Sequence, residues 1–257
     1  MLRAEGLSFK VGPKYLLHET SAEFEEGRFH VIMGANGAGK STLLKLLAGD
    51  LKPSSGKVLL EGKALDLYSK KTLATKRAVL SQHYHISFPI TVNDIVLMGR
   101  YPFFLTHPAA KDIAICEEAM QLMNVAQMKE RDYGTLSGGE AQKVQMSRVL
   151  AQIWEAREGE RRVLFLDEPV SHLDVKYQQQ LLQAARELCR QHTTVIAILH
   201  DMNLAIAFAD RLLLMKEGRM VYDLKHLAEI TTEMIREVFD VPSTILHPER
   251  HKPVVIF

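Results

Sequence analysis

The sequence predicts an α/β fold built on a mainly parallel sheet, with a helical segment inserted into it. Short, fully apolar runs recur in the first and last thirds of the chain, as expected of strands that are covered on both faces. Amphipathic helical patterns separate these runs. From about residue 83 to residue 162, helical patterns follow one another without an apolar strand between them. Alternating strands and helices of this kind are typical of a nucleotide-binding α/β unit.

Length and composition limit the possible functions. With 257 residues, 47% of them hydrophobic, the chain can bury a sizeable core, and we expect one domain with a subdomain. The net charge of +1 disfavours nucleic-acid partners. Cys116 and Cys189 both fall inside helical patterns, which favours a reducing, cytosolic compartment. Because no apolar run approaches the roughly 20 residues of a membrane span, we expect any membrane role to depend on a partner.

In the first third of the chain, strands are predicted where apolar or alternating runs end at turns rich in Gly or Pro. Residues 2–11 alternate loosely, and we expect them to form an edge strand that ends at Gly12 and Pro13. Residues 41–49 have the pattern of a helix. The predicted strands are 2–11, 29–34, 57–61 and 77–80.

The middle of the chain predicts a helical subdomain. One face of its second helix carries apolar residues at helical spacing, which favours core packing over the alternative of a cargo site lined by methionines. These residues are Ile113, Cys116, Met120 and Met123. The charged residues 155–162 predict an exposed loop. The predicted helices are 92–100, 110–125 and 137–156.

The last third returns to buried strands and amphipathic helices, and then to an extended tail. The predicted strands are 163–166, 193–199 and 211–215, the predicted helices are 175–192 and 231–239, and the extended tail is 254–257.

The most specific motif is FHVIMGANGAGKST at residues 29–42, which fits the P-loop pattern G-x-x-x-x-G-K-[ST] between a strand and a helix. Glycines let backbone N–H groups turn inward, and the positive helix end faces the same point, so triphosphate oxygens fit there. Lys40 then reaches the β- and γ-phosphates, and Ser41 ligates Mg²⁺. A chance glycine turn is the alternative, which this context disfavours. The predicted phosphate-binding residues are Gly34, Asn36, Gly37, Ala38, Gly39, Lys40, Ser41 and Thr42.

Two carboxylates follow the apolar run 164–166 at the predicted carboxyl edge of the sheet. Asp167 suits a hold on Mg²⁺, and Glu168 can orient or deprotonate the water that attacks the γ-phosphate. An Asp-Glu pair alone is common by chance. Together with the P-loop it predicts hydrolysis of a nucleoside triphosphate.

A second anion site is predicted at residues 136–140, LSGGE. Ser137 fits the N-cap of a helix, and Gly138 and Gly139 expose its first N–H groups. In a plain cap those glycines would cost about 1 kcal/mol each without a return, so a ligand is favoured. Because one nucleotide already has its own P-loop, the second site most simply serves a nucleotide held by another copy in a two-fold dimer.

In their order along the chain, these motifs resemble those of the ATPase subunits of ATP-binding cassette (ABC) transporters, and the resemblance spans nearly the whole sequence. The matching segments are Walker A (34–41), the Q-loop (Gln82), the signature (136–140), Walker B (163–167) with Glu168, the D-loop (171–174) and the switch histidine (His200). The resemblance implies catalytic roles for Glu168, His200 and Gln82, Mg²⁺ ligation by Ser41, Gln82 and Asp167, and a place for Asp174 in the dimer seam. By themselves, Gln82 and His200 would be ordinary strand-end side chains.

The resemblance also implies a fold and a set of partners. The fold is a single ABC ATPase domain, with a P-loop NTPase (RecA-like) core at 1–82 and 163–257, an N-terminal antiparallel β subdomain, and a helical subdomain at 83–162. The cofactors are ATP and Mg²⁺. The partners are a second copy, two copies of a transmembrane permease, and a periplasmic or surface binding protein. We therefore expect the chain at the cytoplasmic face of the inner membrane.

Two points depart from the family pattern or stay open. Relatives stack an aromatic ring on adenine where this chain has Val11, so Phe9, Val11 and Tyr15 remain candidates. His83, His85 and His172 admit a metal or haem site, although a solvated loop that contacts a partner is favoured.

The segment 98–102 resembles the importers of iron chelates, cobalamin and haem, and the insert 152–161 and the tail around Pro242 and Pro248 look most like the haem importers of this group. We therefore expect haem as cargo, with ferric siderophores or cobalamin as alternatives. A soluble, non-transport ABC ATPase is the other functional class, but the chain has neither a second cassette nor a long coiled coil.

Overall fold

The computed structural model describes residues 1–82, 86–155, 160–171, 173–248 and 252–257. Within them, a six-stranded sheet has the order β10-β9-β3-β8-β7-β6, in which β10 alone runs antiparallel to its neighbour. The prediction of a mainly parallel sheet is confirmed. His83, His85 and His172, which raised the question of a metal, lie outside the described residues. The strands are β3 (Phe29–Gly34), β6 (Arg77–Leu80), β7 (Arg162–Asp167), β8 (Thr193–Ile198), β9 (Arg211–Lys216) and β10 (Arg219–Leu224).

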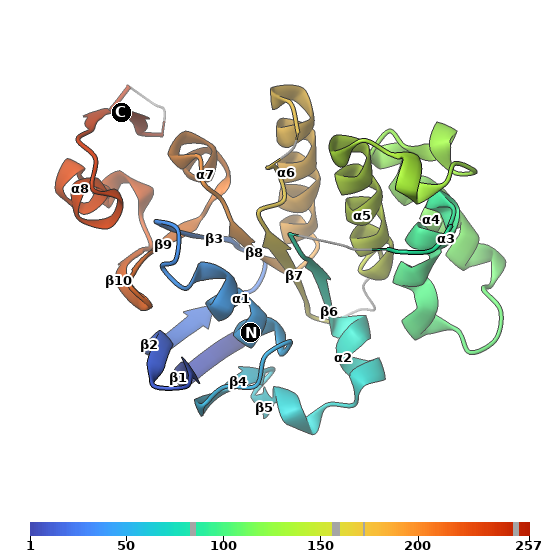
Figure 1. Cartoon of the computed structure of the whole chain (residues 1–257), viewed down its shortest axis with the longest axis horizontal. Helices are drawn as coiled ribbons and strands as arrows, with labels where there is room; N and C mark the ends of the chain where they lie inside the picture. The colour runs from blue at the N-terminus through green and yellow to red at the C-terminus, as the bar shows by residue number, and fades with distance from the viewer. Residues whose placement is uncertain (83–85, 156–159, 172, 249–251) are drawn as a thin grey trace.

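Both faces of this sheet are covered, which explains the apolar runs. In β7, Leu164 and Leu166 join the core on the side of helices α5, α6 and α7, while Val163 and Phe165 join the core on the side of α1. Figure 1 shows α6 and α7 above the sheet and α1 below it. These helices are α1 (Lys40–Ala48), α5 (Gly138–Gln152), α6 (Val175–Arg190) and α7 (Met202–Phe208).

An antiparallel sheet of order β2-β1-β4-β5 packs beneath α1 (Figure 1). The prediction of β1 as an edge strand is wrong, because β1 pairs with β2 on one side and with β4 on the other. Strand β2 had no counterpart in the sequence analysis, since its register depends on partners that local spacing does not reveal. The strands are β1 (Leu2–Val11), β2 (Lys14–Phe24), β4 (Ser55–Leu60) and β5 (Lys63–Ala64).

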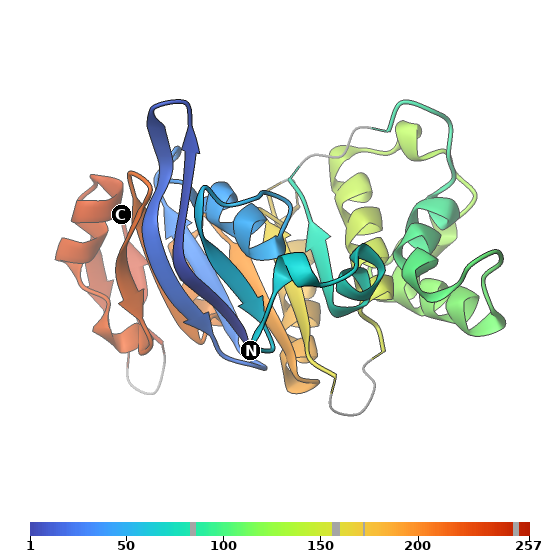
Figure 2. The same ribbon diagram turned by 90° about the horizontal axis from the view of Figure 1, so that it is seen from below.

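The helical segment lies at one end of the molecule, beyond β6 (Figures 1 and 2). Its helices end earlier than predicted: Asn124 takes a left-handed backbone (φ 55°) just after α4, and the side chain of Gln152 donates to the carbonyls of Ala74 and Arg77 at the end of α5. The helices between β4 and α5 are η1 (Leu65–Leu67), α2 (Lys70–Lys76), α3 (Val92–Leu97), η2 (Met98–Phe103), α4 (Ala110–Leu122), η3 (Ala126–Met128) and η4 (Tyr133–Thr135).

Two further expectations for this part of the chain are wrong. Ile113 is 56% exposed, whereas Cys116, Met120 and Met123 are buried as predicted. The buried face of α4 therefore does not include Ile113 in the first turn of the helix. Arg162 does not lie in an exposed loop: it begins β7, is 1% exposed, and donates from its guanidinium to the carbonyl of Ile153. The charged run did not predict this burial, because the hydrogen bond of one arginine to a backbone carbonyl leaves no pattern in the sequence.

After β10 the chain forms η5 (Leu227–Glu229), α8 (Thr232–Phe239), and a small antiparallel pair of β11 (Thr244–Leu246) and β12 (Val254–Ile256). Thr231 caps α8, as the predicted helix start implied. The C-terminal strands lie beside α7 and α8 (Figure 1). None of the helices in the described ranges combines the length and the apolar character that crossing a membrane requires.

Candidate active site

The P-loop connects β3 to α1, and the close approach of other chain segments requires its glycines. A Cβ atom on Gly39 (φ 92°) would lie 2.6 Å from the carbonyl oxygen of Leu16. A Cβ atom on Gly34 would lie 2.2 Å from the carbonyl oxygen of Met215. Both distances are shorter than any non-bonded contact allows, so the loop can pass between β2 and β9 only as glycine.

The side chain of Lys40 folds back over this loop. Its Nζ atom donates to the carbonyls of Gly34 (2.9 Å) and Ala35 (3.0 Å). Burial lowers the pKa of Lys40, against the opposing influence of the nearby Glu168 and Asp167 carboxylates. The partners of this ammonium group within the described residues are neutral carbonyls, so it is available to a stronger, anionic acceptor such as phosphate.

A cavity of about 260 Å³ opens next to Lys40. Its lining includes most of the predicted phosphate-binding residues, whereas Gly34 and Ala38 shape the loop behind it. One lining residue, Leu16, was missed by the sequence analysis. The lining residues are Leu16, Asn36, Gly37, Gly39, Lys40, Ser41, Thr42 and Glu168.

Leu16 reaches the cavity because β2 is irregular there. Lys10 pairs with Tyr15, but Phe9 pairs with Leu17, so Leu16 is an extra residue in the ladder. Such a β-bulge redirects a side chain, and bulges are frequent next to active sites. The sequence carries no local mark of this bulge, because its position depends on the pairing with β1.

Ser41 and Asp167 form the candidate metal position. The Ser41 hydroxyl donates to Oδ1 of Asp167 at 3.1 Å. Asp167 is 3% exposed, and its burial raises the pKa of the carboxyl group, partly offset by the hydrogen bond from Ser41. A buried carboxylate beside a hydroxyl offers the oxygen ligands that Mg²⁺ prefers, so these residues fit Mg²⁺. The positive charge of the ion would stabilise the ionised form of the buried Asp167 carboxylate.

Two of the three predicted catalytic residues, Gln82 and His200, contact the carboxylate of the third, Glu168. Nε2 of Gln82 donates to Oε2 of Glu168 at 2.7 Å, and Nε2 of His200 lies 2.7 Å from Oε1 of the same group. Each residue follows the carboxyl end of one of three neighbouring parallel strands, β6, β7 and β8, which is where ligand sites form in such sheets. Glu168 itself has a left-handed backbone (φ 52°), a conformation that costs energy in a residue with a side chain.

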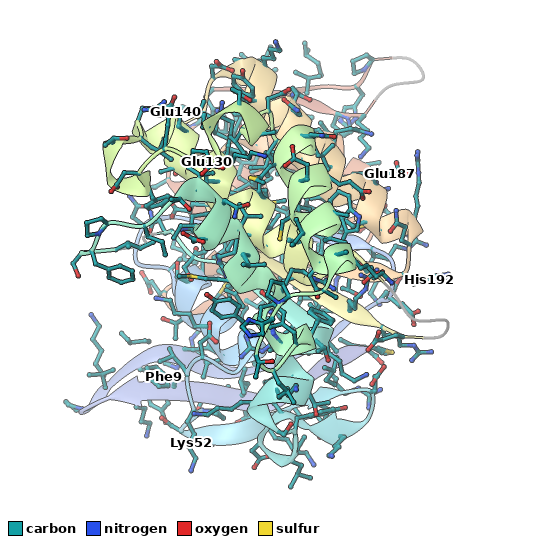
Figure 3. All side chains as sticks on the ribbon, turned by 90° about the vertical axis from the view of Figure 1, so that its right-hand side faces the viewer. Phe9, Lys52, Glu130, Glu140, Glu187 and His192 are labelled. Carbon is teal, nitrogen blue, oxygen red and sulfur yellow. The ribbon has the colours of Figure 1, made fainter. Side chains whose placement is uncertain are left out.

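The LSGGE segment does not line this cavity within the described residues. Ser137 caps α5 by accepting from the backbone N–H of Glu140 (3.3 Å), and Glu140 accepts in return from the N–H of Ser137 (2.8 Å). Figure 1 shows α5 separated from α1 by β6 and β7. In Figure 3, Glu140 lies on the helical segment in the upper part of the view, whereas Phe9 in β1 lies in the lower part. Asp174 likewise caps its own helix, α6, through the N–H of Tyr177 (3.0 Å).

The three candidates for the adenine contact lie on the β1–β2 hairpin, whose tip projects from the molecule (Figure 2). Phe9 is half-buried against the core. Val11 is 58% exposed next to the turn. The ring of Tyr15 stacks on that of His18, with centroids 4.8 Å apart, and the ammonium group of Lys10 lies 4.1 Å from its centroid. Among the described residues, none of the three lines the cavity, and the hairpin residue that does is Leu16.

Comparison with known proteins identifies relatives that match over the full chain. The sequence profile of a family described as ABC transporter matches residues 17–171. The hemin import ATP-binding protein HmuV of Methylobacillus flagellatus is 41% identical over 257 residues, covering 99% of this chain and 95% of that protein. The protein of the same name from Gloeobacter violaceus is also 41% identical, covering 100% of this chain and 94% of its own length.

Solved structures agree on the architecture. A structure assigned to a metal-chelate type ABC transporter in an inward-facing conformation matches with a TM-score of 0.79 and 26% identity, covering 99% of this chain and 96% of that one. A dimeric bacterial ABC transporter cassette matches with a TM-score of 0.77 at 22% identity, covering 88% of this chain and 99% of that one. The second likeness supports the fold.

Proposed function

This chain belongs to the ABC transporter family and is an ATPase, and we propose on that basis that it is the ATP-hydrolysing subunit of a haem importer. The observation that supports haem as the cargo is the extent of the match to the hemin import proteins. Identity of 41% extends over 99–100% of the chain, whereas the family profile matches residues 17–171. The relatives therefore share the C-terminal third, which lies outside the part that matches ABC transporters in general.

We propose that the ATP triphosphate occupies the cavity beside Lys40. The N–H groups of residues 34–42 surround the phosphates, and Lys40 exchanges its two carbonyl partners for β- and γ-phosphate oxygens. The Ser41 hydroxyl, the Asp167 carboxylate and the amide oxygen of Gln82 would hold Mg²⁺, which neutralises phosphate charge when bound.

Glu168 is proposed as the general base. Its carboxylate accepts from Gln82 and faces His200, so its orientation is fixed before a water molecule arrives. His200 is 46% exposed in its side chain, so its outer edge remains open to the γ-phosphate. The three side chains hold the water in line with the phosphorus atom, and Glu168 takes its proton.

Ser137, Gly138 and Gly139 are proposed to complete the site of a second copy. Ser137 and Gly138 are exposed at the start of α5, where the first N–H groups of a helix lack partners within the helix, as an anion site requires. Asp174 is exposed at the start of α6 and is proposed to lie in the same dimer seam.

The proposed assembly has two copies of this chain beneath two permease subunits at the cytoplasmic face of the inner membrane, with a binding protein that delivers the cargo. Residues 83–162 are proposed as the helical subdomain that carries the signature, and residues 1–82 and 163–257 as the ATPase core. Phe88, Tyr101, Phe103 and Leu105 expose apolar surface on this segment, as a contact with a permease would require.

The test reconstitutes the chain with its permease in lipid vesicles and measures ATPase activity and uptake. We expect stimulation by a haem-loaded binding protein, and no uptake when the chain carries Glu168→Gln. Stimulation by a ferric siderophore or cobalamin carrier, without a response to haem, would contradict the cargo and leave the ATPase assignment intact.

A further inference from the structure

Residues 252–256, which include the C-terminal strand β12, contact α7 at two separate positions. At the start of the helix, the side-chain amide of Asn203 donates to the carbonyl of Val255 (2.9 Å) and accepts from its N–H (2.8 Å). Val255 is 3% exposed, so these bonds anchor a buried strand residue. An asparagine that pairs with both backbone groups of one residue acts as a strand partner would, and it fixes the distance between α7 and β12.

At the end of the helix, Lys252 closes the last turn. Its Nζ atom donates to the carbonyls of Ile206 (2.8 Å), Ala207 (2.9 Å) and Ala209 (3.1 Å). The final carbonyls of a helix lack partners within the helix, and they carry its partial negative charge. Residues 252–256, called the C-terminal clamp below, therefore hold both ends of α7.

Helix α7 is short and starts next to the catalytic groups. It has seven residues, too few for a helix to be stable without contacts to the rest of the protein. Its N-cap is Asp201, which accepts from the N–H of Leu204 (2.8 Å), and the residue before this cap is His200. Because His200 is the last residue before the helix cap, the placement of α7 limits where its imidazole can lie.

We propose that the C-terminal clamp positions His200 against Glu168 by fixing α7, so that Asn203 and Lys252 are positioning residues for ATP hydrolysis. The proposal rests on the proposed role of His200. It connects the tail, which the ATPase motifs do not include, to the catalytic carboxylate through Asn203, α7 and the 2.7 Å contact between His200 and Glu168. The phosphate-binding loop lies on other elements, β3 and α1, so nucleotide binding is not expected to depend on the clamp.

The test measures ATPase kinetics of the full-length protein carrying Asn203→Ala or Lys252→Met. We expect each substitution to lower kcat roughly fivefold, as the loss of about 1 kcal/mol of positioning would, with the KM for ATP unchanged. Lys252→Arg keeps the positive charge and is expected to retain most of the wild-type kcat. The matched control is Ile256→Ala, since Ile256 is 49% exposed and lies in the same strand.

Repeating both substitutions in a His200→Ala background distinguishes an effect through His200 from a general structural effect of the tail. If the clamp acts through His200, neither substitution lowers the remaining kcat further; an equal fold-loss in both backgrounds would overturn the proposal. A second measurement follows the imidazole NMR signal of His200, which must shift in the Lys252→Met protein even if Asn203→Ala folds poorly. An unshifted signal together with wild-type kcat also overturns it. If His200→Ala retained wild-type kcat, the proposed role of His200 would be wrong instead, and the haem assignment would be unaffected.

Discussion

Nε2 of His200 lies 2.7 Å from Oε1 of Glu168, although the two residues follow different strands, β8 and β7, and are 32 positions apart in the chain. The other oxygen of this carboxylate accepts from Gln82. Glu168 is therefore held between two side chains that sit at the ends of the neighbouring strands.

Replacing Glu168 with Gln is expected to preserve ATP binding and to slow hydrolysis strongly. The amide keeps the shape of the side chain but cannot accept a proton, and loss of a positioned general base costs on the order of 10² to 10⁴ in rate. The measurement pairs ATP binding by fluorescence titration with steady-state ATPase. Wild-type turnover in a variant that still binds ATP would show that Glu168 is not the base.

Gly139→Asp is expected to abolish turnover without unfolding the protein. An aspartate in the first turn of α5 suits the helix dipole, but in the proposed dimer it would repel the γ-phosphate bound by the other copy. Lys40→Ala is expected to be inactive for a different reason, because it removes the phosphate contact of its own chain.

Mixing Gly139→Asp chains with Lys40→Ala chains tests whether the site is shared. A mixed dimer has one intact site, so an equal mixture is expected to regain roughly a quarter of wild-type activity, or at least to trap ATP in a dimer. A mixture that neither hydrolyses nor traps ATP would contradict a site built from two copies.

Leu16→Ser is expected to raise the KM for ATP about tenfold with little change in kcat, because loss of an aliphatic contact with the nucleotide costs on the order of 1.5 kcal/mol. Leu16 lines the cavity, whereas Val11 is exposed at the hairpin tip. Val11→Ser is therefore the control, and its KM is expected to stay within about twofold of wild type. The opposite result would place the nucleotide base against Val11.

His30 is expected to make the protein sensitive to acid. Burial lowers the pKa of His30 to about 4, and in the described part of the chain only one of its ring nitrogens has a partner, the carbonyl of Glu25 at 3.1 Å. The unfolded chain binds a proton at this position below about pH 6.5, whereas the folded chain does so only near pH 4. Acid therefore favours unfolding between these values, and the contribution of a neutral His30 is complete above pH 6.5.

The measurement compares the free energy of unfolding in urea at pH 7.5 and pH 5. Wild type is expected to lose about 2 kcal/mol more than His30→Gln over this interval, because only wild type must give up the proton on folding. An equal loss in both proteins would mean that His30 does not carry the acid sensitivity.

The sequence determined the parts of this protein that depend on short-range spacing. The P-loop, the strand that ends at Asp167 just before Glu168, and the Ser137 cap are recognisable because each motif fits within a few residues, and the structure places them where the spacing predicts. Strands covered on both faces were also predictable, because their apolar runs are continuous. Most of the order of strands and helices in the core could be written down from the chain for the same reason, but β10 and α7 had no counterpart in the sequence analysis.

Tertiary structure decided the features that depend on pairing between distant segments. The place of β1 inside its sheet, the bulge that turns Leu16 toward the cavity, and the burial of Arg162 each require a partner that local periodicity does not contain. The same holds for Asn203 and Val255, which are 52 positions apart. Hydrogen-bond partners across such separations are selected by the packing of whole elements, so only the folded chain reveals which side chain meets which backbone group.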